Sequence, residues 1–159
     1  IVKSVKAILE SKIWGQDGSL GTIRYILFCD SDWTIVCFVM AKYRWFPLGK
    51  TILEPDAITC PQGQGKLVSG LTRKAIKDCP PATEYLPVAA QAKLGKKIER
   101  LRLNRKSTDK AAKIDVRIRS LVDKMNPHLR STKEIIGYRI QAKDGEIGTV
   151  GDACFDPSQ

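Results

Sequence analysis

The chain has 159 residues, of which 43% are hydrophobic. That is enough to bury one core or two small ones, and it excludes a disordered tail. The 27 Lys and Arg against 17 Asp and Glu give a formal charge of +10, which favours an acidic partner such as nucleic acid, anionic lipid or an acidic protein face.

Residues 1 to about 60 are predicted to form β-strands, because short runs rich in β-branched and aromatic residues are separated by turn residues. The predicted strands are Lys12 to Trp14, Thr22 to Phe28, Trp33 to Met40 and Thr51 to Leu53. Asp17-Gly18 lies between the first two, where glycine supplies the positive φ that a hairpin turn needs. Thr72 is expected to cap a short helix over Arg73 to Asp78, which Pro80-Pro81 ends.

The run from Trp33 to Met40 is apolar on both faces. Because side chains alternate along a strand, one face is predicted to carry Trp33, Ile35, Cys37 and Val39. The other face carries Val36, Phe38 and Met40, where a strand on a solvent-exposed wall should place polar residues. Val36, Phe38 and Met40 are therefore candidate partner-binding residues.

Residues 92 to 126 change to a helical period. Leu94, Ile98 and Leu101 are spaced i, i+4 and i+7. A second stripe predicts a helix over Asp109 to Met125 that packs against protein, and it consists of Ile114, Ile118, Leu121, Val122 and Met125. Between Lys93 and Arg130 there are thirteen Lys or Arg and four acids, which give +9 of the chain's +10. This excess suggests a specific use of the charge, and the candidate partner-binding cations are Lys96, Lys97, Arg100, Arg102, Arg105, Lys106, Lys113, Arg117 and Arg119.

The chain contains an internal repeat. Shifted by 127 positions, Ser4 to Ser31 aligns with Ser131 to Ser158 without a gap. The matching residues are Ile8 with Ile135, Ile13 with Ile140, Asp17-Gly18 with Asp144-Gly145, Gly21-Thr22 with Gly148-Thr149, and Phe28 with Phe155. Matches at turn glycines and apolar positions indicate a repeated β unit.

These residues carry a family resemblance. GYRIQAKDGEIGTV, Gly137 to Val150, resembles the opening of a PRC-barrel domain. DWTIVCFVMAKYRWFPLGKTILEP, Asp32 to Pro55, is similar to the family's run of a strand, a Trp-x-Pro turn and a further strand. This module is shared by the cytoplasmic part of the purple-bacterial reaction-centre H subunit and a ribosome-maturation factor. The resemblance covers about residues 4 to 88 and 127 to 159. It is nearest to bacterial proteins with two such barrels, although the acids usual near Cys29 and Ala41, and the glycine usual at Glu10, are absent.

The resemblance implies a mainly β fold in three parts: a small PRC-type β-barrel over residues 1–88, a basic helical linker over 89–130 and an incomplete second repeat over 131–159. The expected core of the first part consists of Ile8, Ile13, Leu20, Ile23, Ile35, Val39, Ile52 and Leu53. The second copy stops at Gln159, where a counterpart of Trp33 and later strands would follow. The chain also begins at Ile1 without Met, so a trimmed chain and an incomplete reading frame both fit.

The half repeat is expected to need a partner. A two-stranded hairpin is marginal alone, and its unpaired edge invites strand addition. Its apolar side chains are too many to leave in water, and they are Ile135, Ile136, Ile140, Ile147, Val150 and Phe155. We expect the hairpin to pair with the same segment of a second molecule in a symmetric dimer, the alternative being a hairpin that stays mobile.

Few residues could carry chemistry. His128 is the only histidine, so one chain cannot build a Ser-His, Cys-His or two-His metal arrangement, and we expect it to be a plain exposed residue. Asp17 and Asp144 each precede glycine in a turn, where Asp serves its own backbone. The three tryptophans are predicted to be core or turn anchors. The five cysteines lack CxxC spacing, which fits neither a disulfide framework nor a zinc site and favours a reducing cytoplasm.

Together these observations favour a cytoplasmic, non-enzymatic interaction or assembly module without a cofactor. No apolar run approaches the roughly 20 residues that span a bilayer. The family resemblance implies docking onto a larger assembly, photosynthetic or ribosome-associated. The alternative is a nucleic-acid-binding protein whose basic helices track phosphates. An enzyme would need a co-purifying cofactor, because no general base is visible.

Overall fold

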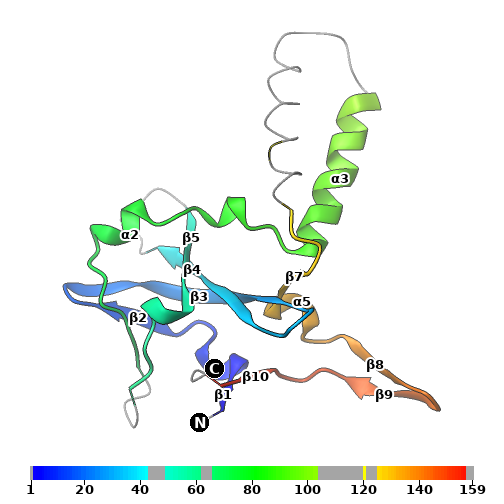
Figure 1. The fold of residues 1–159 in the computed structure, drawn as a ribbon, viewed down its shortest axis with the longest axis horizontal. Coiled ribbons are helices and arrows are strands. Elements are labelled where there is room, and N and C mark those ends of the chain that lie inside the picture. The colour runs from blue at the N-terminus through cyan, green and yellow to red at the C-terminus, as the bar shows by residue number, and fades with distance from the viewer. Residues whose placement is uncertain (1, 43–48, 62–65, 104–119, 121–124, 157–159) are drawn as a thin grey trace.

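A computed structural model describes residues 2–42, 49–61, 66–103, 120 and 125–156 of the chain. The fold is mixed α/β with more strand than helix, so helices contribute more than a mainly β fold would have. A central sheet carries two projections, the helix α3 (Val88–Leu103) and the hairpin of β8 (Arg139–Ala142) and β9 (Gly145–Thr149) (Figure 1). None of the described helices is both long enough and apolar enough to cross a membrane.

The remaining elements are short. The other strands are β1 (Lys3–Ser4), β2 (Lys12–Gly15), β3 (Gly18–Cys29), β4 (Ile35–Lys42), β5 (Lys50–Leu53), β6 (Leu67–Val68), β7 (Leu129–Ser131) and β10 (Cys154–Phe155). The other helices are α1 (Val5–Ile8), α2 (Ala75–Asp78) and α5 (Thr132–Ile135), with the 3-10 turns η1 (Pro55–Ala57) and η2 (Ala82–Glu84). All four predicted strands are present. The short helix predicted over Arg73 to Asp78 begins at Ala75, with Lys74 at its N-cap position. Thr72 Oγ1 accepts a hydrogen bond from the N–H of Ala75 at 3.2 Å, just before this start.

Six strands form the central sheet. They are hydrogen-bonded in the order β5-β4-β3-β2-β6, and β7 pairs with the far end of β3. The β2–β6 pair is parallel and the others are antiparallel, so the sheet is mixed. Across the part of the chain that is described, β5 and β6 are not paired with each other, and the sheet therefore does not close into the predicted barrel.

The hairpin of β2 and β3 turns at Asp17-Gly18, as predicted. Gly15 pairs with Gly18, whose φ of +126° is one that residues with a side chain rarely adopt. The expectation that Asp17 serves its own backbone is wrong, because its carboxylate accepts hydrogen bonds from the N–H of Arg73 at 2.9 and 3.1 Å. The turn is thereby tied to the segment that leads into α2.

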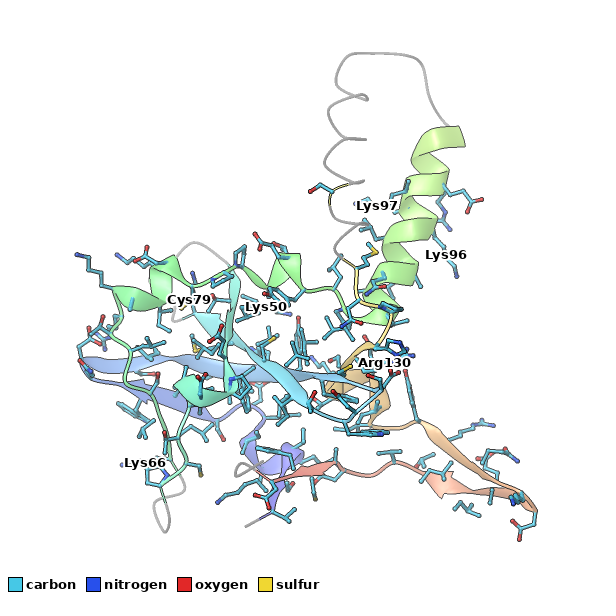
Figure 2. The ribbon with its side chains drawn as sticks, viewed as in Figure 1. Lys50, Lys66, Cys79, Lys96, Lys97 and Arg130 are labelled. Carbon is cyan, nitrogen blue, oxygen red and sulfur yellow. The ribbon has the colours of Figure 1, made fainter. Side chains whose placement is uncertain are left out.

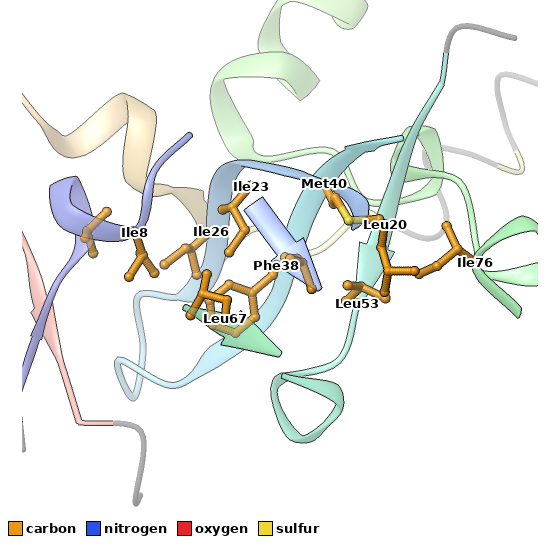
Figure 3. Close-up of a cluster of buried hydrophobic side chains, with 11 residues drawn as sticks. Ile8, Leu20, Ile23, Ile26, Phe38, Met40, Leu53, Leu67 and Ile76 are labelled. Carbon is orange, nitrogen blue, oxygen red and sulfur yellow. The ribbon is translucent and has the colours of Figure 1, made fainter. Parts of the chain in front are cut away.

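The core occupies both faces of the sheet. The larger cluster, shown in Figure 3, consists of Val5, Ile8, Ile13, Leu20, Ile23, Ile26, Phe38, Met40, Leu53, Leu67 and Ile76. The smaller cluster consists of Leu27, Cys37, Val39, Ile52, Ala82 and Leu129. Of the eight predicted core residues only Ile35 is not fully buried, and it packs against the larger cluster.

Strand β4 supplies both clusters, which explains why both of its faces are apolar. Ile35 packs on the side of Phe38 and Met40, whereas strict alternation predicted that it would share a face with Cys37 and Val39. The cause is a shift in the β3–β4 register between Leu27 and Phe28. Such a bulge adds one residue to a strand and reverses the face on which the following side chains lie.

The internal repeat appears as a reciprocal exchange of strands. Strand β7 pairs antiparallel with the end of β3, with Ser131 opposite Leu27. Strand β1 pairs antiparallel with β10, with Ser4 opposite Cys154. Because a shift of 127 positions converts one pair into the other, each copy lends its first strand to the other copy. Pairing therefore crosses the boundaries predicted at residues 88 and 131.

The helices that follow these exchanged strands also repeat. Ser4 Oγ accepts from the N–H of Ala7 at the start of α1, and Ser131 Oγ accepts from the N–H of Lys133 at the start of α5, both at 3.2 Å. Such N-caps satisfy helix donors that have no partner within the helix. The two copies therefore begin with the same strand, cap and short helix.

Truncating Ile13 and its repeat equivalent Ile140 should have unequal costs, because Ile13 is buried and Ile140 is exposed. We expect Ile13→Ala to lower the free energy of unfolding by about 2–5 kcal/mol through lost burial and a cavity. For Ile140→Ala we expect a loss of about 0.5 kcal/mol or less. Urea unfolding of the two variants measures both values, and equal losses would contradict the burial described.

Candidate functional site

The hairpin β8–β9 has the same backbone as the hairpin β2–β3. Both contain a shift of register at the same place, after Ile13 in the first copy and after Ile140 in the second. The turn glycines also correspond, with φ of +126° at Gly18 and +145° at Gly145. Because the backbones agree, the surroundings of equivalent residues can be compared directly.

The two hairpins differ in what covers them. Ile13 and Leu20 are 0% and 3% exposed, whereas their equivalents Ile140 and Ile147 are 40% and 68% exposed. The first pair belongs to a cluster completed by side chains that follow β3 in the chain, namely Met40, Leu53, Leu67 and Ile76. The described residues of the second copy end at 156 and include no counterpart of these. Ile140 and Ile147, together with the exposed Tyr138, form an apolar surface that we call the half-repeat surface.

A cavity of about 390 Å³ lies between the two copies, beside Tyr138. Its lining includes Phe28 and Trp33 from the first copy and Ile135, Tyr138, Val150 and Ala153 from the second. Three of these are repeat equivalents of buried residues in the larger cluster: Ile135 of Ile8, Val150 of Ile23 and Ala153 of Ile26. The cavity therefore lies where the second copy would have its own core.

Trp33 borders this cavity in an unusual conformation. Its φ is +61°, its side chain is 72% exposed, and its ring stacks on Phe28 with the centroids 5.5 Å apart. A residue with a side chain persists at positive φ only where its surroundings fix it. Neither described tryptophan is in the core: Trp33 lies exposed in the turn between β3 and β4, and Trp14 is exposed on β2. Trp45 lies outside the described residues.

The candidate residues on β4 are mostly covered by the chain itself. Phe38 and Met40 are buried in the larger cluster, so they leave little surface for a partner. Val36 is half-buried against the smaller cluster and lines a pocket of about 290 Å³ with Tyr85 and Leu129. The helix that was expected to pack its apolar stripe on protein, residues 109–125, lies almost wholly outside the described residues.

The candidate cations that the structure describes lie on α3. Lys96, Lys97 and Arg100 are exposed, and with Lys93 they are spaced i, i+3, i+4 and i+7, which places them on one face of the helix. Figure 2 shows Lys96 and Lys97 well away from the central sheet. Arg102 lies in the last turn of α3. The other candidates fall outside the described residues, and they are Arg105, Lys106, Lys113, Arg117 and Arg119.

His128 has a partner that the sequence did not reveal. Its Nδ1 lies 2.9 Å from Oδ1 of Asp30, and Nε of Arg130 donates to Oδ2 of the same carboxylate at 2.5 Å. The hydrogen bond from Arg130, and then that from His128, lower the pKa of Asp30. Because 98 residues separate His128 from Asp30, local sequence gave no signal of the pair. The cluster links Asp30, directly after β3, to His128 and Arg130 at the start of β7.

Within the ranges given above, no three His, Cys, Asp or Glu side chains gather closely enough to hold a metal ion. Burial raises the pKa of the Cys37 thiol to about 12, so this thiol stays protonated and is a poor nucleophile. The two surface features described above are the apolar half-repeat surface and the basic face of α3.

No family model and no curated protein matches the chain.

Replacing Asp30 should alter how stability depends on acid. Its pKa in the folded chain lies below the ordinary value of 3.8, so its stabilising effect is present above that pH and is lost as the pH falls through the folded-state pKa. We expect the melting temperature of Asp30→Asn to lie below that of the wild type at about pH 5, and the gap to narrow as the pH falls below 3.8. Thermal melts across this range measure the difference, and a gap that does not vary with pH would contradict the prediction.

Proposed function

We propose that this chain is a non-enzymatic interaction and assembly module, built on a PRC-type unit, whose docking site is the half-repeat surface. The observation that carries the proposal is the exposure of Ile140 and Ile147 at positions whose equivalents, Ile13 and Leu20, are buried. Removing apolar area from water is favourable by about 25 cal/mol per Å², so a partner that covers these side chains gains this contribution, from which the cost of association is subtracted.

The surroundings of the surface support a protein partner. Arg139 and Glu146 face each other across the hairpin with Nη1 and Oε2 3.4 Å apart, and both are exposed. An apolar centre bordered by exposed charges is the usual composition of a protein interface. Such a surface recognises shape and apolar area and supplies no group that could act on a substrate.

The resemblance to PRC barrels suggests the class of partner. Members of that family dock as modules on larger assemblies, so the expected partner of this chain is a photosynthetic or ribosome-associated complex. The internal repeat supports it, because two copies that exchange their first strands are joined into one body that leaves the half-repeat surface uncovered among the described residues. That surface is where a larger assembly would be joined.

In the absence of another partner, the half-repeat surface should cover itself by self-association. We expect light scattering of the wild type to show a mass that rises toward a dimer with concentration. The double variant Ile140→Glu with Ile147→Glu should stay monomeric, because two like charges would face each other across the contact. Lys143→Glu, at the exposed tip of the same hairpin, is the matched control and should behave as the wild type.

Two outcomes would contradict this prediction. One is a wild type that stays monomeric at every concentration, and the other is a double variant that still dimerises. Because both isoleucines are exposed, the double variant should unfold at about the same temperature as the wild type at a concentration low enough for the wild type to be monomeric, and this excludes misfolding as the cause of a lost dimer.

A second function, binding of nucleic acid, is favoured by the basic face of α3. Four cations spaced along two turns can each contact a phosphate and release a counterion. This reading predicts retention on duplex RNA or DNA that falls steeply as the salt concentration rises.

The double variant Lys96→Glu with Lys97→Glu tests this reading. If both lysines contact phosphates, the slope of log affinity against log salt should be shallower by about 2. Lys66→Glu with Lys74→Glu changes the net charge equally at exposed positions away from α3, and it should change the slope less. Equal effects of the two double variants would show that net charge alone is responsible.

A further inference from the structure

Four cations form a stripe along the projecting helix α3, and they are Lys93, Lys96, Lys97 and Arg100. All four are exposed, and at a rise of about 1.5 Å per residue they lie within about 10 Å of helix length. Glu99 is the single acidic residue of α3. Figure 1 shows that the helix projects from the central sheet, and Figure 2 shows Lys96 and Lys97 on this projection. The stripe is therefore an accessible line of positive charge.

The stripe works against the helix that carries it. Lys93 and Lys97 are four residues apart, as are Lys96 and Arg100, and each of these pairs is a pair of neighbours on the helix surface. Like charges at this spacing destabilise a helix. A polyanion laid along the stripe would neutralise the charges and remove this repulsion. The spacing therefore favours an anionic ligand over a face that is only solvated.

The other side of α3 argues against a lipid surface as this ligand. The apolar residues of the helix lie opposite the stripe, where Ile98 is buried and Leu94 is half-buried. An amphipathic helix that binds a membrane surface inserts its apolar side between the lipids. Because this side of α3 is already covered, the cations lack the apolar contact that such binding needs.

The composition of α3 separates the remaining polyanions. The helix contains no aromatic residue, whereas a single-stranded nucleic acid is held by stacking its bases on aromatic side chains. Protein interfaces are built around apolar and aromatic residues and are depleted of lysine, yet three of the four cations are lysines. A nucleic-acid duplex needs cations alone, because it presents one phosphate charge per about 1.7 Å of its axis.

We infer that α3 binds the phosphate backbone of a nucleic-acid duplex, in preference to a single strand and without reading its sequence. Each cation that contacts a phosphate releases condensed counterions, and the release per contact is greater on a duplex than on a single strand. Contacts to phosphate carry no sequence information, and lysine acts as a point charge on a flexible stem. This inference rests on the second function proposed above, because it names the ligand of the same basic face.

The experiment uses the full chain and four probes: a short labelled DNA duplex, the same duplex with its sequence scrambled, one of its single strands, and vesicles that contain phosphatidylserine. Fluorescence anisotropy at several salt concentrations measures binding to the nucleic acids, and cosedimentation measures binding to the vesicles. The stripe variant is Lys93→Gln with Arg100→Gln. The matched control is Lys66→Gln with Lys74→Gln, at exposed positions outside α3. Because the stripe variant loses like charges, it should keep α3 folded, which circular dichroism checks.

We expect the two duplexes to bind alike, and more tightly than the single strand. Log affinity for the duplex should fall with log salt with a slope of about −3.6 or steeper, because four phosphate contacts each contribute about −0.9. The stripe variant should make this slope shallower by about 2, and the control should change it less. The vesicles should not bind the chain at the same salt concentration.

The inference is overturned if the single strand binds as tightly as the duplex, if the scrambled duplex binds differently, or if the two double variants change the slope equally. Tighter binding to the single strand would refute the preference for a duplex and leave the nucleic-acid function standing. Failure to bind any nucleic acid would refute both, and retention on the vesicles instead would assign the stripe to a lipid surface.

Discussion

The structure depends on strand β3, whose 12 residues extend beyond each strand beside it. The start of β3 pairs with β2, and the end of β3 pairs with β7, which comes from the second copy. Between these two pairings the buried N–H of Ile26 donates a hydrogen bond to Oγ1 of Thr132 at 3.1 Å. A buried donor without a partner costs about 1–3 kcal/mol, so the first copy is incomplete without the second. The position of α5, and with it the wall of the cavity, follows from this one link.

Regular features of the fold were predictable because they are local. The turn at Asp17-Gly18, the short helix after Thr72 and most of the buried residues follow from patterns that a few neighbouring residues define. The repeat was also readable, since turn glycines and apolar positions recur at a fixed separation. It correctly implied that residues 139–149 form a second copy of the first hairpin. It did not reveal that the copies exchange strands, because a sequence alignment does not show which edge a strand joins.

The features that escaped prediction all depend on tertiary placement. The bulge at Val36, opposite Leu27 and Phe28, reversed the face on which Ile35 lies, and bulges leave no reliable trace in a hydrophobic pattern. Asp17 and His128 found partners far along the chain, Arg73 and Asp30. For the candidate site, the apolar residues of the half repeat were identified from the sequence, and the structure leaves Ile140 and Ile147 exposed. Their burial by a partner stays a prediction. The cavity was not predicted from the sequence, because residues of both copies line it. Ala153, the repeat equivalent of Ile26, has a smaller side chain and so leaves space that isoleucine fills in the first copy.

The exchange of strands also sets an order of events during synthesis. Folding of the first copy can begin once β2 to β5 have left the ribosome, yet the end of β3 and the N–H of Ile26 have no partner until Thr132 emerges more than one hundred residues later. Closing so long a loop costs little more than closing a shorter one, so the basic segment between the copies can vary in length without much thermodynamic penalty. The kinetic effect is larger, because contacts between distant residues form late and leave apolar edges exposed meanwhile. While the ribosome synthesises the linker, the sheet of the first copy therefore remains incomplete. Chaperone binding to the nascent chain should be strongest in that interval.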